Sequence, residues 1–172
     1  SQRCQVNSSA LKQSLLNINL FPDRRIVAVR DRETRAANGD KVWVGRVLDE
    51  PFSRVTLSDC AGVIAGSIEL VRYGGSEVYE ITPTPAGDSL ITQVEMSGDV
   101  CPVVLPVGQV PPGSSPPPIA GDGSVSTIDL LVVYSPASRT LYGKAGIEAM
   151  IMSAVADANT AYQNTMINAA LN

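Results

Sequence analysis

The sequence predicts a mainly β fold, an antiparallel sandwich or open barrel, followed by an incomplete α/β segment. Three observations support this. Apolar residues alternate with period two over residues 17–96, turn signals recur at short intervals in that region, and the pattern changes after residue 126. We therefore divide the chain into a β-rich region at 1–100, a linker at 101–126 and an α/β segment at 127–172.

Alternation in the first region predicts short strands with one buried face. In VWVGRVL, Val42 and Val44 fall on one face, and Trp43 and Val47 fall on the other. The next two segments continue the pattern with Val55 and Leu57, then with Ile64, Gly66, Ile68 and Leu70. Turn residues such as Asn38-Gly39-Asp40 and Cys60-Ala61-Gly62 separate these segments. A short helix is expected before them, from Ser9 to Leu16.

Proline dominates the stretch between Cys101 and Gly123, where Gly and Ser are also frequent and charge almost vanishes. Because proline lacks the amide hydrogen that sheets and helices need, this stretch is predicted to be an extended, solvated linker.

The last region has a different pattern. Residues Leu130 to Tyr134 are apolar without interruption, which is typical of a strand buried on both faces. Ser135 and Pro136 are a suitable N-cap and first helical residue, and Gly143 and Gly146 should interrupt the first turns. The expected helix has an apolar stripe made of Ile147, Met150, Ile151, Ala154, Val155, Ala158 and Tyr162.

One strand and one helix cannot bury their apolar surfaces on each other alone. We therefore expect the rest of an α/β domain downstream of Asn172. Without it, the helix stripe must pack on the β-rich region, on another chain or on a copy of itself.

The composition excludes several partners. A net charge of −4 argues against nucleic acid or acidic lipid, and the arginines of DRRIVAVRDRETR alternate with acidic residues that can pair with them. No apolar run is long enough to span a membrane, and no signal peptide opens the chain. The protein is therefore expected to be cytosolic, or to have lost its signal peptide.

Known catalytic patterns are also missing. The chain has no histidine, which excludes a Ser-His-Asp arrangement and any histidine-ligated zinc site within it. It has no phosphate-binding glycine motif and no CxxC pair. We expect this chain alone to be inactive as an enzyme.

Several ordered blocks carry a family resemblance. NINLFPDRRIVAVRDRETR, KVWVGRVLDEP, SRVTL, GVIAGSIEL and EVYEITP together resemble the prodomain of secreted bacterial metalloproteases of the reprolysin-like group of metzincins. STIDLLVVYSPASR and the helix ending in ADANTAYQNTMINAALN resemble the first strand and first long helix of their catalytic domain. The resemblance covers nearly the whole chain from about Asn17.

The resemblance implies a secreted zymogen whose signal peptide has been removed. The β-rich region would inhibit the zinc metalloendopeptidase domain and assist its folding, with that domain in cis or on a separate chain, until cleavage between Val103 and Ser126 activates it. Family members bind zinc through an HExxHxxGxxH motif, which would lie downstream, so this chain would bind no zinc alone. The alternatives are a secreted β-sandwich adhesion module on a proline-rich spacer, and a truncated pseudo-protease that serves only as an interaction protein.

Three cysteines leave the role of Cys101 open. Some metzincin prodomains block the enzyme with a cysteine thiolate that occupies the fourth zinc position. Cys101 follows the last predicted strand and precedes the linker, where such an inhibitory ligand could reach the active site. Its surroundings, GDVCPVV, lack the pattern of well-known switch peptides. The other interpretations are a disulfide with Cys60 or Cys4, and an inert buried thiol. Cys60 itself falls at a predicted hairpin turn, where a structural role is expected.

Overall fold

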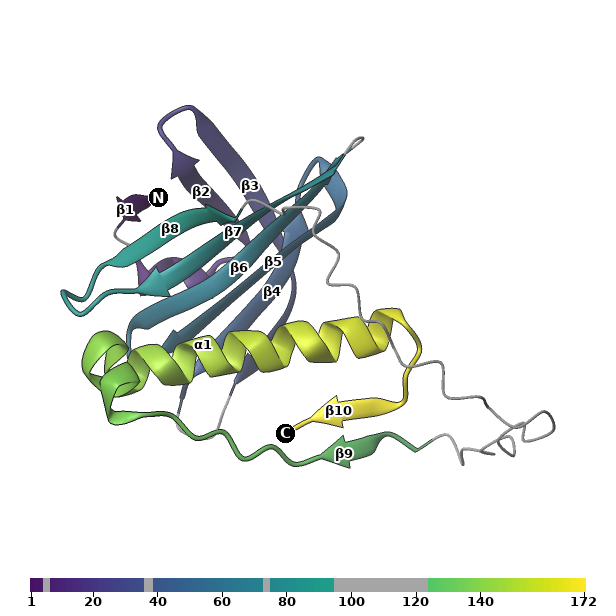
Figure 1. Ribbon diagram of the computed structural model, residues 1–172. Coiled ribbons are helices and arrows are strands. Elements are labelled where there is room, and N and C mark those ends of the chain that lie inside the picture. Colours follow the sequence, from purple (N-terminus) through teal and green to yellow (C-terminus); the bar gives the residue numbers. More distant parts are fainter. Residues whose placement is uncertain (5–6, 36–38, 73–74, 95–123) are drawn as a thin grey trace, which may run out of the picture.

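The computed structural model describes residues 1–4, 7–35, 39–72, 75–94 and 124–172. The fold is mainly β, as predicted: one eight-stranded antiparallel sheet forms a nearly closed barrel, accompanied by one long helix and a small parallel sheet (Figure 1). The barrel strands are β1 (Gln2–Cys4), β2 (Leu15–Phe21), β3 (Arg24–Arg35), β4 (Lys41–Val47), β5 (Glu50–Cys60), β6 (Val63–Arg72), β7 (Gly75–Pro83) and β8 (Ser89–Val94).

Strands β2 to β8 follow one another as an up-and-down meander, and the N-terminal strand β1 pairs with β8. The sheet order is therefore β1-β8-β7-β6-β5-β4-β3-β2, which places β1 and β2 at its two ends. Between the described residues of these two strands no ladder is formed. A seam consequently remains where the barrel would otherwise close.

The barrel interior confirms the predicted alternation. Trp43, Val47, Val55, Leu57, Ile64, Ile68 and Leu70 all belong to one buried cluster, together with residues from β2, β3, β7 and β8. Gly66 pairs with Leu57, and a Cβ on Gly66 would lie 2.2 Å from the carbonyl oxygen of Thr56. The close packing of β5 and β6 therefore requires glycine at this position.

The helix expected from Ser9 to Leu16 is a shorter 3-10 helix, η1 (Ser8–Lys12), because Leu15 and Leu16 already belong to β2. Asn7 caps it by accepting a hydrogen bond from the backbone N–H of Ser9, and Leu11 is buried in the barrel cluster. The indole Nε1 of Trp43 donates to the carbonyl oxygen of Gln13 at 3.1 Å. The end of η1 is thereby tied to the centre of the core.

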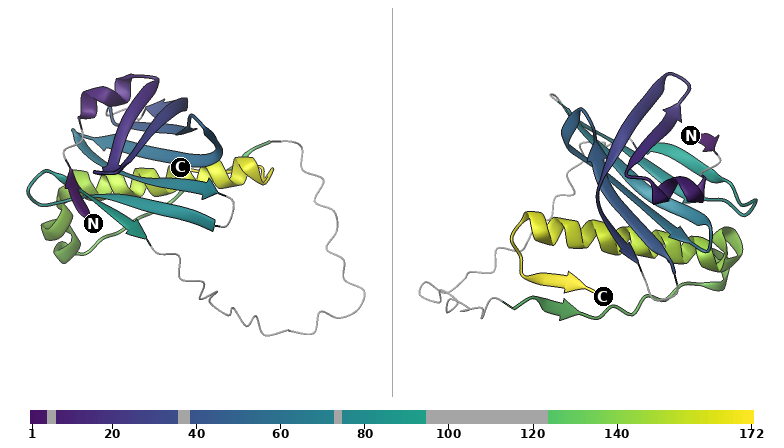
Figure 2. Two further views of the ribbon diagram at one scale, coloured as in Figure 1. Left: turned by 90° about the horizontal axis from the view of Figure 1, so that it is seen from above. Right: turned by 180° about the vertical axis from the view of Figure 1, so that it is seen from behind.

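The C-terminal segment is a βαβ unit. Strand β9 (Ser126–Ile128) and strand β10 (Ala169–Leu171) pair in parallel, and α1 (Pro136–Asn164) connects them. Ser135 caps α1, and Gly143, at φ 70° and ψ 167°, interrupts it as predicted. The prediction was wrong for Gly146, which is a helical residue. The two views in Figure 2 show α1 lying along the outside of the barrel.

Two features of this segment differ from the sequence prediction. Residues Leu130 to Tyr134 form no strand and are exposed, with Leu131 at 91%. A doubly buried strand needs covering layers on both faces, and the described residues provide none here. The expected apolar stripe on α1 is also only partly buried, because the helix turns its small residues toward the barrel. Most of the predicted linker lies outside the described residues.

Candidate docking interface between the barrel and helix α1

The outer face of β5 and β6 is small and polar where α1 crosses it. Thr56, Ser58 and Ser67 point outward, because their neighbours Val55, Leu57, Ile64 and Ile68 fill the barrel. Thr56 and Ser58 are completely buried although they lie outside the barrel. Helix α1 is therefore the layer that covers this face.

The facing side of α1 consists mainly of small residues, with Met150 and Met152 packed against Cys60 and Ala65 beside them. Gly146, Ala149 and Ser153 are buried, and their spacing of three and four residues places them on one side of the helix. A Cβ on Gly146 would lie 2.9 Å from Cγ of Pro83, so glycine allows the helix to approach the end of β7. Ser58 Oγ donates to the carbonyl oxygen of Ala149 at 2.6 Å. The helix thus lies close enough to the sheet for a side chain of β5 to bond to its backbone.

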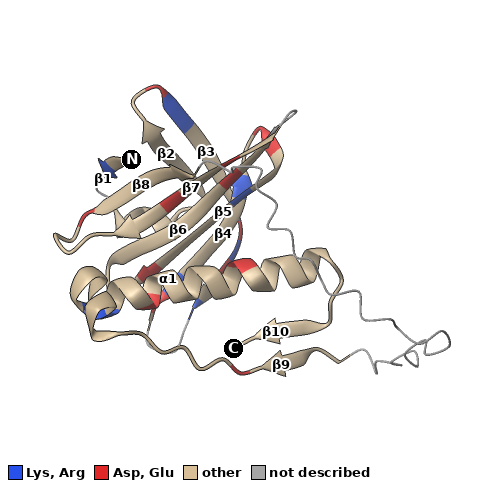
Figure 3. Cartoon of the chain, in the orientation of Figure 1, with Lys and Arg blue, Asp and Glu red and all other residues tan. Residues whose placement is uncertain are grey.

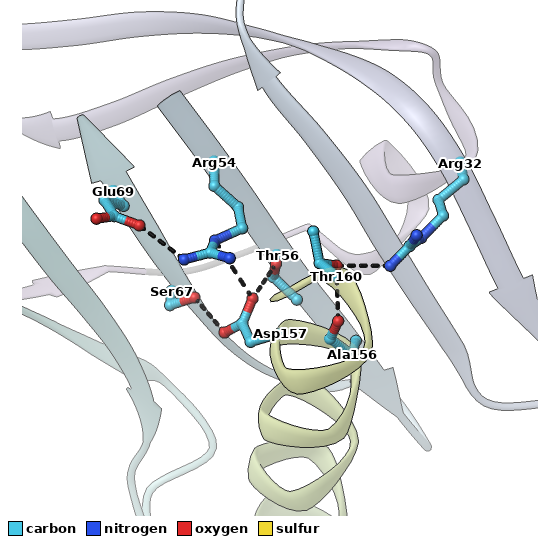
Figure 4. A network of polar contacts seen from close by, with 8 residues as sticks. All are labelled: Arg32, Arg54, Thr56, Ser67, Glu69, Ala156, Asp157 and Thr160. Atoms are coloured by element: carbon cyan, nitrogen blue, oxygen red, sulfur yellow. Dashed lines mark hydrogen bonds and ion pairs between the residues drawn. The ribbon is translucent and has the colours of Figure 1, made fainter. Parts of the chain in front are cut away.

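Asp157 continues the same side of α1 and is its main polar anchor (Figure 4). Its Oδ1 accepts a hydrogen bond from Thr56 Oγ1 at 2.6 Å, and its Oδ2 accepts one from Ser67 Oγ at 2.8 Å. Arg54 Nε lies 3.9 Å from Oδ1, while Arg54 Nη2 donates to Glu69 at 2.8 Å. One carboxylate therefore bridges two neighbouring strands.

Arg32 makes a second polar contact, from β3. Its Nη2 donates to Thr160 Oγ1 at 2.6 Å (Figure 4). Its Nη1 donates to Gln163. Ala28 of the same strand is in the barrel core, so regular alternation would also point Arg32 inward. The register shift between Arg30 and Arg32 changes that direction and places Arg32 opposite Val44 on the outer face.

Three of the other four arginines of β3 form ion pairs with acidic residues, as expected for this segment. Arg24 pairs with Glu77 at 2.7 Å, and Arg30 and Arg35 both pair with Glu33 at 2.5 Å. The Arg35 hydrogen bond lowers the pKa of the Glu33 carboxyl despite the opposing effect of burial. By contrast, charged residues are sparse along α1 (Figure 3).

Cys60 lies at the edge of the interface. Its thiol is 1% exposed, donates to Asp40 at 3.0 Å and lies 3.5 Å from the sulfur of Met152 on α1. Burial, reinforced by the neighbouring Asp40 carboxylate, raises the pKa of Cys60 to about 12. The thiol is therefore protonated and inert at neutral pH, which agrees with the structural role expected for Cys60.

Cys101, the predicted metal ligand, lies outside the described residues. Cys4 and Cys60, its proposed disulfide partners, are free cysteines. Within the ranges the structure describes, no group of three or more histidine, cysteine, aspartate or glutamate side chains is placed to hold a metal ion. Those residues also include no helix long and apolar enough to cross a membrane.

An open cavity of about 590 Å³ lies beside the interface, between α1, β10 and the barrel. Val42, Ile151, Val155 and Leu171 contribute apolar walls, and Arg32 lies at one side. Ile151 and Val155 of the apolar stripe thus line the space between α1 and the small sheet, whereas Met150 of the same stripe packs against Cys60 and Ala65 of the barrel.

Sequence reasoning missed Asp157 and its hydroxyl partners. One signal was present: Asp157 is the only charged residue between Ala149 and Asn164. Thr56 and Ser58 also alternate with the predicted core positions, which marks a polar outer face but does not reveal what covers it. Comparisons with protein-family models, curated proteins and solved structures found no match to this chain.

Proposed function

We propose that this chain is the propeptide region of a secreted zinc metalloendopeptidase zymogen, joined to the first elements of the protease domain. In this proposal the barrel inhibits the protease and assists its folding, and cleavage in the linker activates it. The proposal rests on the family resemblance of the ordered sequence blocks. The protein would act outside the cell after removal of its signal peptide.

The docking of α1 on the barrel is the structural observation that supports this proposal. The helix resembles the first long helix of the protease domain, and it packs on the outer face of β5 and β6 through Thr56, Ser67 and Asp157. A prodomain that assists folding must hold an element of the enzyme before the enzyme's own core exists. The barrel holds such an element through a small, polar contact, which can be exchanged for other contacts later.

Zinc enters the proposal only through the protease domain downstream. The described residues do not fit a zinc site, because they contain no histidine and no suitable ligand cluster. Cys101 is proposed as an inhibitory thiolate ligand of that zinc. The alternative of a disulfide to Cys4 or Cys60 stays open, although Cys60 could pair only after α1 moved away from its buried thiol.

Folding assistance can be tested in the full-length proform with Thr56→Val, which removes one hydrogen bond to Asp157 and keeps the side-chain shape. We expect a lower yield of zinc-dependent peptidase after refolding and activation. Thr92→Val on β8 is the matched control and should refold like the wild type. An unchanged yield for Thr56→Val would contradict a folding role for this contact.

Inhibition can be tested with Cys101→Ser in the same proform. Loss of latency is expected if the thiolate blocks zinc, whereas unchanged latency would rule out Cys101 as the inhibitory ligand. Residues 1–172 should inhibit the cognate active protease when added to it, which an adhesion module would not do. Zinc-dependent proteolysis by residues 1–172 alone would overturn the proposed propeptide function.

A further inference from the structure

The seam of the barrel contains a second cavity, of about 420 Å³. It lies between β1 and β2, the two ends of the sheet, and reaches the interior residues Leu57, Ile81 and Ile91. Residues Ala10 and Leu11 of η1 close another side. The walls therefore come from η1 and five strands of the barrel region, and from no part of α1.

Polarity changes from the inside of this seam cavity to its opening. The inner residues Leu11, Leu16, Leu57, Ile81 and Ile91 are all buried and apolar. Four polar residues that line it, Arg3, Asn7, Asn17 and Asn19, are exposed, and a fifth, Gln2, is half-buried. A ligand with an apolar body and a polar end would match this arrangement.

Arg3 gives the opening a positive charge that is only weakly compensated. Its Nη1 lies 3.9 Å from the carboxylate of Asp88, a long ion pair, and the Arg3 side chain is 75% exposed. Such exposed pairs contribute little free energy, so an anionic ligand can compete for the guanidinium. The side chains of Asn17 and Asn19 lie on the exposed side of β2 and supply amide donors at the same opening.

We propose that the seam cavity binds a linear apolar molecule with a carboxylate end, that is, a fatty acid. Eight-stranded barrels have an interior that side chains either fill or share with one small ligand, and barrel mouths are common ligand sites. The cavity volume falls within the ordinary range for such sites, roughly 300–1,000 Å³. The acyl chain lies against Leu16, Leu57 and Ile91, and the carboxylate lies near Arg3.

Cys4 lines the same cavity and provides a reporter for occupancy. Its thiol is half-buried and free, and burial, together with the charge of Asp88, raises the pKa of Cys4. We therefore expect slow reaction of this thiol with maleimide, and a bound acyl chain should slow the reaction further. Peptide mass mapping separates labelling at Cys4 from labelling at the other two cysteines.

The direct test is titration of residues 1–172 with a fluorescent polyene fatty acid, followed by displacement with dodecanoate. We expect saturable binding of one probe per chain. Ile18→Trp fills the cavity wall and should weaken binding at least about tenfold. Leu15→Trp places the same side chain at an exposed position of β2 outside the cavity and should change the affinity less than about twofold.

A second variant distinguishes the contribution of the carboxylate to binding from that of the acyl chain. Arg3→Gln should weaken displacement by dodecanoate about fivefold and leave displacement by dodecanol unchanged. If Ile18→Trp fails to fold, binding in the cavity is tested by the protection of Cys4 from labelling that dodecanoate gives in the wild type. The proposal is overturned if the probe does not saturate, if folded Ile18→Trp binds like the wild type, or if dodecanoate leaves the labelling rate of Cys4 unchanged. None of these outcomes depends on protease inhibition.

Discussion

The barrel interior and the docking interface are both buried, but the interior is filled by large apolar side chains, whereas the interface combines small polar residues with a small apolar cluster around Cys60, Ala65 and Ala149. Inside the barrel, Trp43 is 1% exposed and Ile68 is completely buried within a continuous apolar cluster. At the interface the buried residues include Thr56, Ser58 and Ser153, which are small and polar. Burial of apolar area stabilises the first region, whereas hydrogen bonds with modest net free energy contribute much of the second.

This difference suggests that the barrel is a folding unit and that α1 is attached to it less strongly. The strand ladders and the apolar cluster belong to residues 2–94, and η1 covers one end of the barrel. Helix α1 could leave without exposing that cluster, because it touches only the outer face of the strands. The following predictions test this distinction, beginning with the largest expected effect.

Trp43→Ala should be the most damaging substitution. It removes the largest fully buried side chain and the indole hydrogen bond to Gln13, and it leaves a cavity in the barrel. We expect the free energy of unfolding to fall by about 3–5 kcal/mol in urea denaturation. Phe52→Ala, at an aromatic residue of β5 that is 81% exposed, is the control and should change stability by less than about 0.5 kcal/mol.

Asp157→Ala should release α1 while the barrel stays folded. The substitution leaves the hydroxyls of Thr56 and Ser67 without their shared acceptor, at a cost of about 1–3 kcal/mol to docking. Limited proteolysis should cut α1 faster, with residues 1–94 still protected. Asp23→Ala, in the exposed β2–β3 turn, should leave the cleavage pattern unchanged. Simultaneous loss of barrel protection would show that the two regions fold as one unit.

The barrel was predictable because its signal is local. Each strand needs only alternation along its own residues, so Trp43 could be separated from Val42 and Val44, and Val55 grouped with Leu57, before any pairing was known. Arg32 could not be assigned in this way. Its outward direction depends on a register shift between β3 and β4, which is a property of two strands together.

The C-terminal segment shows the same limit. The continuous run from Leu130 to Tyr134 predicts burial, yet burial also needs elements on both sides, and the run is exposed. Helical spacing placed Ile151 and Val155 on one apolar stripe of the helix. It could not show that the opposite side of the helix, with Asp157, contacts the barrel. The seam cavity was equally hidden, because it depends on how far β1 and β2 remain apart.

Arg32→Gln should have a smaller effect than Asp157→Ala. Within the described part of the chain, the guanidinium donates to two neutral groups, Thr160 and Gln163, near the end of α1. We expect docking to weaken by about 0.5–1.5 kcal/mol, with faster amide hydrogen exchange confined to the last turns of the helix. Arg25→Gln, an exposed position on the same strand, should leave exchange in α1 unchanged. Faster exchange along the whole helix would indicate that Arg32 contributes as much as Asp157 to the docking of α1.

Cys60→Ala should have the smallest effect on the pH dependence of stability near neutral pH. The Cys60 thiol also reports whether α1 is docked. The folded-state pKa of about 12 lies above the ordinary 9.0, so the thiol is protonated in both folded and unfolded protein well below pH 9 and adds no pH dependence there. From pH 9 to 12 the unfolded chain releases this proton and the folded chain retains it, so stability falls as pH rises. Cys60→Ala should remove that part of the dependence of stability on pH.

In Asp157→Ala, undocking of α1 should bring the pKa of Cys60 down and make the thiol react with a disulfide reagent at pH 8. A Cys60 that reacts equally fast in wild type and in Asp157→Ala would contradict the assignment of its burial to helix docking.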